Sequence, residues 1–165
     1  MKYLNVSLIG LSGRRHPSLS GATTTEEVKK MRPHLKMLVC DYLTYEVRAQ
    51  HSGGSPICRL CRLNCESISH VLTSCFKLSE TRSRILREFS SLCSVTKSQI
   101  DFEYISSDKE ILSQFLIDPC SFNLTQRVHI DDPAVDQFYR LSRDLCFALD
   151  KDRRSQLSAL AKENM

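Results

Sequence analysis

The sequence predicts a mainly α-helical protein, in which a small helical domain carries an embedded CCHC zinc-binding module and a C-terminal helical tail. Apolar residues recur at helical spacing along several segments. Two segments open with capping-box patterns, which are typical of helix starts. One short stretch holds three cysteines and a histidine at metal-ligand spacing. At 165 residues, the chain is long enough to bury a core, either as one domain or as one small domain with a metal module.

The N-terminal part divides into an arm and a helical segment. Residues 1–23 are expected to form a loose arm, because they lack apolar periodicity and contain three glycines and a proline. A helix then begins at the capping box of Thr24 and Glu27, and the segment 24–55 is expected to be helical. Its apolar stripe, which runs toward Gln50 as one helix, comprises Leu35, Leu38, Val39, Tyr42 and Leu43.

Residues 56–76 are predicted to form the zinc module, after a flexible joint at 52–56 that is the clearest domain boundary. The ligands follow the order Cys-x2-Cys-x8-His-x4-Cys: Cys58, Cys61, His70 and Cys75. Two residues between the first cysteines allow a tight turn that brings both sulfurs, and nearby backbone N–H groups, to one ion. A short helical segment then turns His70 toward the metal and ends at Cys75. Four protein ligands leave no position for an activated water, so one structural Zn²⁺ is expected.

Other uses of these cysteines remain open at this point. They could be buried or redox thiols, although a thioredoxin-type CxxC would follow a strand in a βαβ unit, a pattern that is absent here. Disulfides are the least favoured alternative, because the sequence predicts a reduced protein. Cys65 could replace one ligand, but its place in the connecting loop favours a bystander.

The C-terminal region, residues 77–165, is expected to hold three helices. The first follows Leu78, the second opens at a capping box in 107–110 and stops at Asp118 and Pro119, and the third begins at 132–133 with an Asp-Pro pair. Three cysteines on or beside the apolar stripes are predicted to be buried core residues: Cys40, Cys93 and Cys146.

Positive charge concentrates in the half that holds the predicted metal site. Residues 1–87 carry 14 Lys and Arg against 6 Asp and Glu, a net charge of +8, whereas residues 88–165 carry −4. This asymmetry is typical of phosphate contacts, and RNA or DNA is favoured as partner over a merely solvated helix face. Tyr42 or Tyr45 could stack on a base, with core packing favoured for Tyr42. The predicted contacts beside the module are Arg59, Arg62, Lys77 and Arg82.

The cellular setting follows from the N-terminus and the hydropathy. The first residues lack a cleavage-like site, and no apolar run approaches the roughly 20 residues of a transmembrane helix. We therefore expect a protein that is not secreted, has no membrane partner and resides in the nucleus or cytoplasm. Nor does the sequence contain a phosphate-cradling glycine-rich loop or a nucleophile elbow, so no enzymatic activity is expected.

Several segments together resemble the C-terminal zinc-binding region of non-LTR retrotransposon reverse transcriptases. Besides the Cys/His tetrad, they are Arg32-Pro33-His34-Leu35, Ser52-Gly53-Gly54-Ser55-Pro56, Ser69-His70-Val71-Leu72, Gln114-Phe115-Leu116-Ile117-Asp118-Pro119 and Leu141-Ser142-Arg143-Asp144-Leu145-Cys146. The resemblance implies a zinc-bearing segment that grips element RNA or target DNA. Because the polymerase palm and its aspartates are missing, it also implies a truncated or domesticated fragment without polymerase activity. The alternative is a structural or protein-interaction helical module that zinc merely staples.

Overall fold

The computed structural model describes residues 24–95, 100–119 and 132–163, and these ranges fold as helices joined by short links. The predicted arm, residues 1–23, lies outside the described residues. Within the described ranges, the one β feature is an isolated antiparallel bridge between Ile57 and Cys65. The predicted mainly α fold is therefore confirmed.

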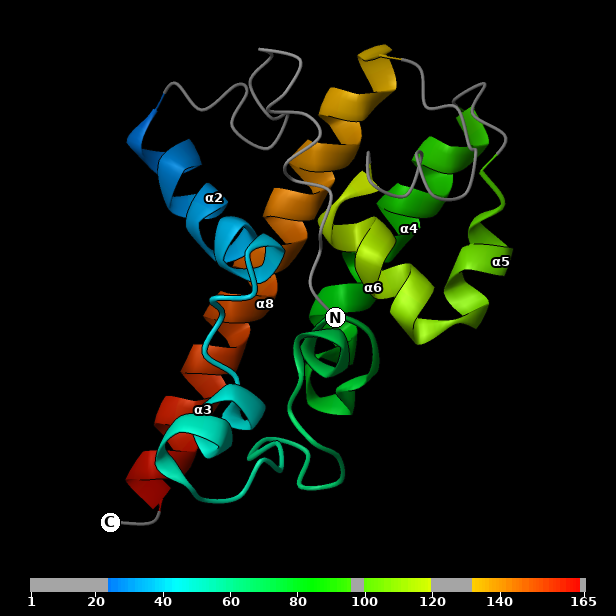
Figure 1. Ribbon diagram of the computed structural model, residues 1–165. Helices are drawn as coiled ribbons and strands as arrows, with labels where there is room; N and C mark the ends of the chain where they lie inside the picture. Colours follow the sequence, from blue (N-terminus) through cyan, green and yellow to red (C-terminus); the bar gives the residue numbers. More distant parts are fainter. Residues whose placement is uncertain (1–23, 96–99, 120–131, 164–165) are drawn as a thin grey trace.

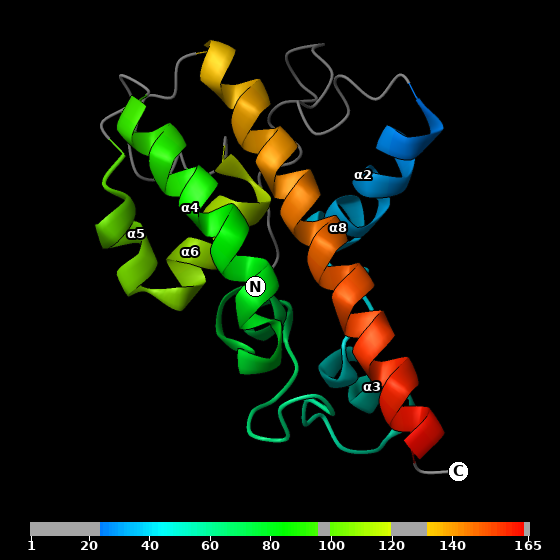
Figure 2. The same cartoon turned by 180° about the vertical axis from the view of Figure 1, so that it is seen from behind.

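One long helix organises the molecule. Helix α8, Asp132–Glu163, runs its whole length, with α2, Thr25–Leu38, and α4, Ser79–Val95, packed on opposite sides of it (Figures 1 and 2). The short helix α3, Tyr45–Ser52, lies beside the C-terminal half of α8. Helix α6, Lys109–Ile117, packs against both α4 and α8 and also contacts α2, and the short helix α5, Phe102–Ser107, pairs with α6 at the edge of the molecule. The predicted start of the last helix at 132 is confirmed.

The caps set most of these boundaries. Thr24 and Glu27 form the predicted capping box, and Pro33 lies inside α2 without ending it. Helix α6 begins one residue later than its capping pattern suggested: Asp108, not Ser107, accepts the N–H groups of Glu110 and Ile111.

The prediction of one helix running toward Gln50 is wrong. Helix α2 ends at Leu38, Cys40 takes a left-handed conformation with φ 59°, and Thr44 caps a new helix by accepting the N–H of Val47. The break turns Tyr42 toward α8, where its hydroxyl donates to Asp150 at 2.9 Å. It also leaves Cys40 exposed, contrary to prediction, whereas the predicted core cysteines Cys93 and Cys146 are buried.

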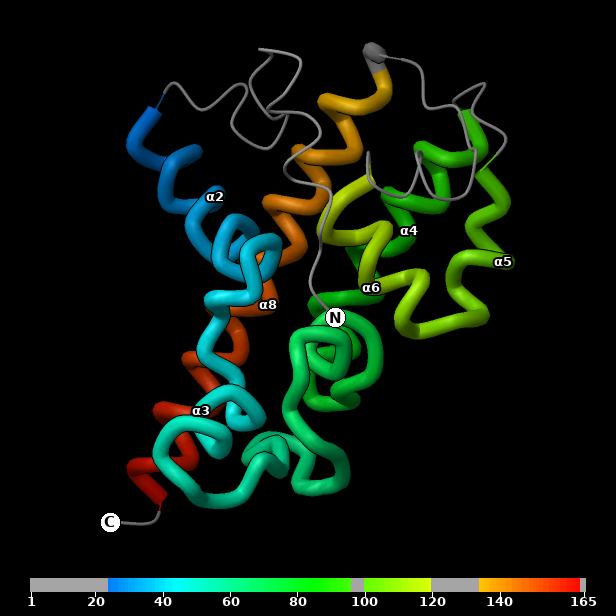
Figure 3. The backbone as a smooth tube through the Cα atoms, viewed as in Figure 1, coloured from blue at the N-terminus to red at the C-terminus, as the bar shows by residue number. Residues whose placement is uncertain are grey.

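The core lies between α4, α6 and α8. Three fully buried rings meet there, with centroids 5.9 Å apart for Phe89 and Phe115 and 5.5 Å apart for Phe115 and Phe138. The same cluster of buried side chains extends without a gap to the cysteines of the predicted metal module. As Figure 3 shows, the chain between α3 and α4 loops across the end of the molecule to deliver that module.

Candidate metal centre and basic surface

Three cysteines and one histidine converge on a single point beneath the start of α4. The ligand atoms of Cys58, Cys61, His70 and Cys75 all lie within 4.8 Å of one another, and all four residues are buried. The Sγ atoms of Cys58 and Cys75 are 3.9 Å apart, so these two cysteines are not joined by a disulfide. The Sγ of Cys61 lies 3.4 Å from the Nε2 of His70. The four residues could hold one metal ion.

The first two ligands lie on a tight turn whose backbone faces the sulfurs. Arg62 closes the turn: its N–H donates to the carbonyl of Cys58 at 2.8 Å, and its φ is 59°. Burial raises the pKa of Cys58 to about 12, although backbone N–H groups of the turn oppose this effect. At Cys61 burial also acts upward, but the N–H groups of Leu63 and Asn64 prevail and lower the pKa of the thiol.

The other two ligands lie on a wide helical turn. Residues His70–Ser74 form a π-helix, η2, in which the N–H of Cys75 donates to the carbonyl of His70 at 2.8 Å. The sequence predicted a short helical segment here but not its wider turn. Burial lowers the pKa of His70, which favours the neutral imidazole that metals require. The Oγ of Ser74 lies 3.4 Å from Nδ1, so it can orient the ring while Nε2 faces the cysteines.

Arg82, near the start of α4, holds the backbone that carries two of the ligands. Its guanidinium donates to the carbonyls of Val71 at 3.2 Å and Cys75 at 2.8 Å, and the residue is only 6% exposed. The prediction that Arg82 contacts phosphate is therefore wrong, because its charged group is committed to the backbone that carries the ligands. Helical spacing alone did not reveal that the side chain of Arg82 points into the protein.

A buried ion pair ties the module to α8. Glu66, fully buried, accepts from the guanidinium of Arg153 at 2.5 Å and from the N–H of Tyr45 at 3.0 Å. Burial acts to lower the pKa of Arg153, but the hydrogen bond to Glu66 and neighbouring groups raise it above its ordinary value. The sequence analysis did not identify this pair, whose partners are 87 positions apart in the chain.

Cys65 stands outside the cluster, as expected of a bystander. Its backbone forms the bridge to Ile57, and the residue is half-buried. Burial raises the pKa of its thiol, and the nearby carboxylate of Glu46 adds to the rise. The structure brings the four predicted ligands together without it.

The other predicted phosphate contacts lie at the surface of the module. Arg59, Arg62 and Lys77 are all exposed. The guanidinium carbon of Arg59 lies 4.9 Å from the ring centroid of Tyr45, a cation–π distance that holds the side chain against α3. Tyr42, by contrast, is buried in the core, as its spacing favoured.

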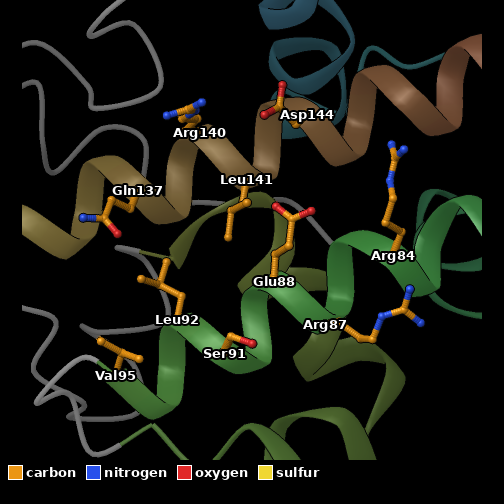
Figure 4. Close-up of a pocket in the computed structure, with 10 residues that line it drawn as sticks. All are labelled: Arg84, Arg87, Glu88, Ser91, Leu92, Val95, Gln137, Arg140, Leu141 and Asp144. Carbon is orange, nitrogen blue, oxygen red and sulfur yellow. The ribbon is translucent and has the colours of Figure 1, made fainter.

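We name three of the hollows that adjoin these elements. We call the first the α2–α8 groove; it measures about 550 Å³ and is bordered by α2, α8 and the start of α3. The second, the CxxC hollow, measures about 320 Å³ and is lined by Tyr45, Arg59 and Arg62 among others. The third, the α4–α8 pocket, measures about 830 Å³. Figure 4 shows Glu88 of α4 and Leu141 of α8 pointing toward one another across it.

The fold and the site define a small helical protein with a buried Cys₃His cluster that could hold one metal ion. Comparison with known protein families, curated proteins and solved structures gives no match. In the part of the chain that the structure describes, every helix is too short or too polar to cross a membrane.

Proposed function

We propose that the chain is a zinc-stabilised nucleic-acid-binding module, derived from the C-terminal region of a non-LTR retrotransposon reverse transcriptase and without polymerase activity. The order and spacing of the tetrad, together with the helical segments whose sequences resemble that region, support this proposed origin. One observation carries the binding function: the turn that supplies Cys58 and Cys61 to the buried cluster also presents the exposed Arg59 and Arg62.

The geometry of the cluster favours zinc. Around a tetrahedral Zn²⁺, sulfurs at about 2.3 Å lie about 3.8 Å from each other, which agrees with the 3.9 Å between Cys58 and Cys75. Four protein ligands complete the coordination, so the ion has a structural role and activates no water. Binding of structural zinc supplies roughly 10–16 kcal/mol of apparent free energy, enough to organise a loop that has little secondary structure of its own.

Metal analysis of variants tests the ligand assignment. The purified protein is expected to hold one zinc per chain, and Cys58→Ser or His70→Ala is expected to release it. Cys65→Ser is the matched control, since it removes a thiol from the same loop but not from the cluster, and it should retain the metal. Full zinc occupancy in the Cys58 and His70 variants would refute the assignment.

A salt titration on the same sample tests nucleic-acid binding. Affinity for single-stranded RNA and for duplex DNA should fall steeply with salt, because each phosphate contact releases a counterion. Replacing both Arg59 and Arg62 with Gln should weaken binding. An affinity that is flat in salt and unchanged in this variant would refute the proposal.

A second candidate, a protein-interaction module stapled by zinc, is supported by exposed apolar side chains on and next to the module. Leu63 is 69% exposed, Phe76 51% and Ile57 40%. Under this candidate, charge removal at Arg59 and Arg62 leaves any nucleic-acid affinity unchanged, while Leu63→Asp abolishes capture of a protein partner.

A further inference from the structure

The α2–α8 groove is lined by basic side chains that converge from three separate helices. Half of its twelve lining residues are basic: Lys29, Arg32, Lys36, Arg48, Arg153 and Arg154. The first three recur along one face of α2 at helical spacing, Arg48 comes from α3, and the last two come from α8. The groove therefore concentrates positive charge that the sequence distributes over 126 positions.

The one acid among the lining residues is already neutralised. Asp150 is buried, accepts from the hydroxyl of Tyr42 at 2.9 Å and pairs with Arg154 at 2.6 Å. The charges of Arg32, Lys36 and Arg48 thus face the groove without a carboxylate in its lining to oppose them. Such a surface raises the local concentration of anions.

A buried arginine at the floor of the groove adds a second observation. Arg153 is only 5% exposed, and its guanidinium reaches Glu66 at 2.5 Å and the carbonyl of Leu43 at 3.4 Å. Its Nε is a buried donor without a hydrogen-bond partner in the described part of the chain. A buried donor that lacks a partner costs free energy, so Arg153, which lines the groove, has hydrogen-bonding capacity that its contacts with Glu66 and Leu43 leave unused.

The groove continues into the CxxC hollow. Leu157 of α8 lines both, and the ring of Tyr45 joins them, with Arg48 at 5.6 Å on the groove side and Arg59 at 4.9 Å on the hollow side. The ring of Tyr45 and these two guanidinium groups thus lie between the groove and the hollow. Together the groove and the hollow lead from α2, across α3, to the turn that carries Cys58 and Cys61.

We propose that the α2–α8 groove binds the phosphate backbone of a single nucleic-acid strand that continues onto the CxxC hollow. The inference rests on the proposed function and extends it to residues far from the metal cluster. A basic groove bordered by aromatic side chains, here Tyr45 and Phe147, is the usual site for a single strand, because it follows the backbone and reads no base edges. RNA and single-stranded DNA share this phosphate chemistry.

The test compares two pairs of neutralising substitutions in the full zinc-loaded chain. Arg32→Gln with Lys36→Gln removes two charges from the α2–α8 groove. Arg87→Gln with Arg140→Gln removes the same charge from the α4–α8 pocket, where both side chains are exposed (Figure 4). Equal zinc content and equal melting temperature establish that all proteins are folded. The probe is a 12-nucleotide single-stranded RNA, with single-stranded DNA and polyglutamate of equal length, measured by fluorescence anisotropy from 50 to 200 mM salt.

In the groove variant, the plot of log association constant against log salt concentration is expected to become shallower by about 1.4. Each phosphate contact with a single strand contributes about 0.7 to the slope, and the variant removes two. Between 50 and 200 mM salt, the wild type should therefore lose about sevenfold more affinity than this variant. The pocket variant should keep the wild-type slope. If the groove variant shows the same loss with single-stranded RNA and with single-stranded DNA, the groove recognises the phosphate groups that the two share.

Three results overturn the inference. If Arg59→Gln with Arg62→Gln weakens binding but the groove variant does not, the groove is not the site, while the proposed function stands. If the groove variant and the pocket variant reduce the steepness of the salt dependence equally, binding depends on the overall charge of the protein and not on the groove. If polyglutamate binds as tightly as RNA and shows the same loss, the groove selects an acidic polypeptide instead. Absence of any binding by the wild type refutes the proposed function itself.

Discussion

Removal of the Glu66 carboxylate is expected to destabilise the protein by roughly 4 kcal/mol. In Glu66→Ala, the guanidinium of Arg153 would stay buried with one long hydrogen bond to Leu43, and the N–H of Tyr45 would lose its acceptor. Breaking a buried pair by removing one partner costs about 3–5 kcal/mol, and an unpaired buried amide adds about 1 kcal/mol or more. The two costs add to about 4–6 kcal/mol, and water that enters the space left by the carboxylate should bring the loss toward the lower value.

A double-mutant cycle separates the pair from the packing. Arg153→Met alone leaves the Glu66 carboxylate buried and should cost a similar amount. The combination of Glu66→Ala with Arg153→Met removes both charges, so its cost should fall at least 2 kcal/mol below the sum of the single variants.

Urea unfolding followed by circular dichroism measures these differences. Each protein must be saturated with zinc, because metal that binds only the folded state adds to its stability. The reasoning is refuted if Glu66→Ala lowers the free energy of unfolding by less than 1 kcal/mol and the effects of the two single substitutions add in the double variant. The two charged groups would then be hydrated in the folded protein.

Two further predictions concern the core and the thiols. Phe115→Ala removes the central ring of the buried aromatic group and should cost about 3–5 kcal/mol in the same urea assay; a loss below 1 kcal/mol would mean that the core repacks. Burial raises the pKa of Cys93 to about 12, so at pH 8 only about one thiol in ten thousand is the reactive thiolate. Iodoacetamide, mapped by peptide mass, should therefore modify the exposed Cys40 and spare Cys93, and equal modification of both would contradict the described burial.

Local chemistry made part of the fold predictable. The capping box at Thr24, the stop at Asp118 and the metal-ligand spacing act over a few residues, and each appears where the sequence indicated. The break after Leu38 was not predictable in this way. The apolar stripe fits a continuous helix, and what favours the break is a contact between Tyr42 and Asp150, 108 positions apart.

In the candidate site, too, the local sequence predicted some features, whereas others depend on how the helices pack. Spacing identified the four residues of the cluster, because the chain between them is short enough to fix their distance. It did not identify the direction of Arg82, which depends on how α4 docks on the ligand-bearing turns. The α2–α8 groove was equally hidden, since Arg32, Arg48 and Arg154 become neighbours only when three helices have packed.

The position of Arg82 bears on the electrostatic balance of the cluster. Three thiolates around one divalent ion carry a net charge of −1, and a buried net charge is costly to remove from water. The guanidinium of Arg82, which interacts with Cys75, brings a compensating positive charge to the same buried region. With a divalent ion bound, the four ligands, the ion and this arginine would together carry no net charge. Such a buried unit would need no counterion from solvent, so the exposed Arg59 and Arg62 would not be required to balance its charge.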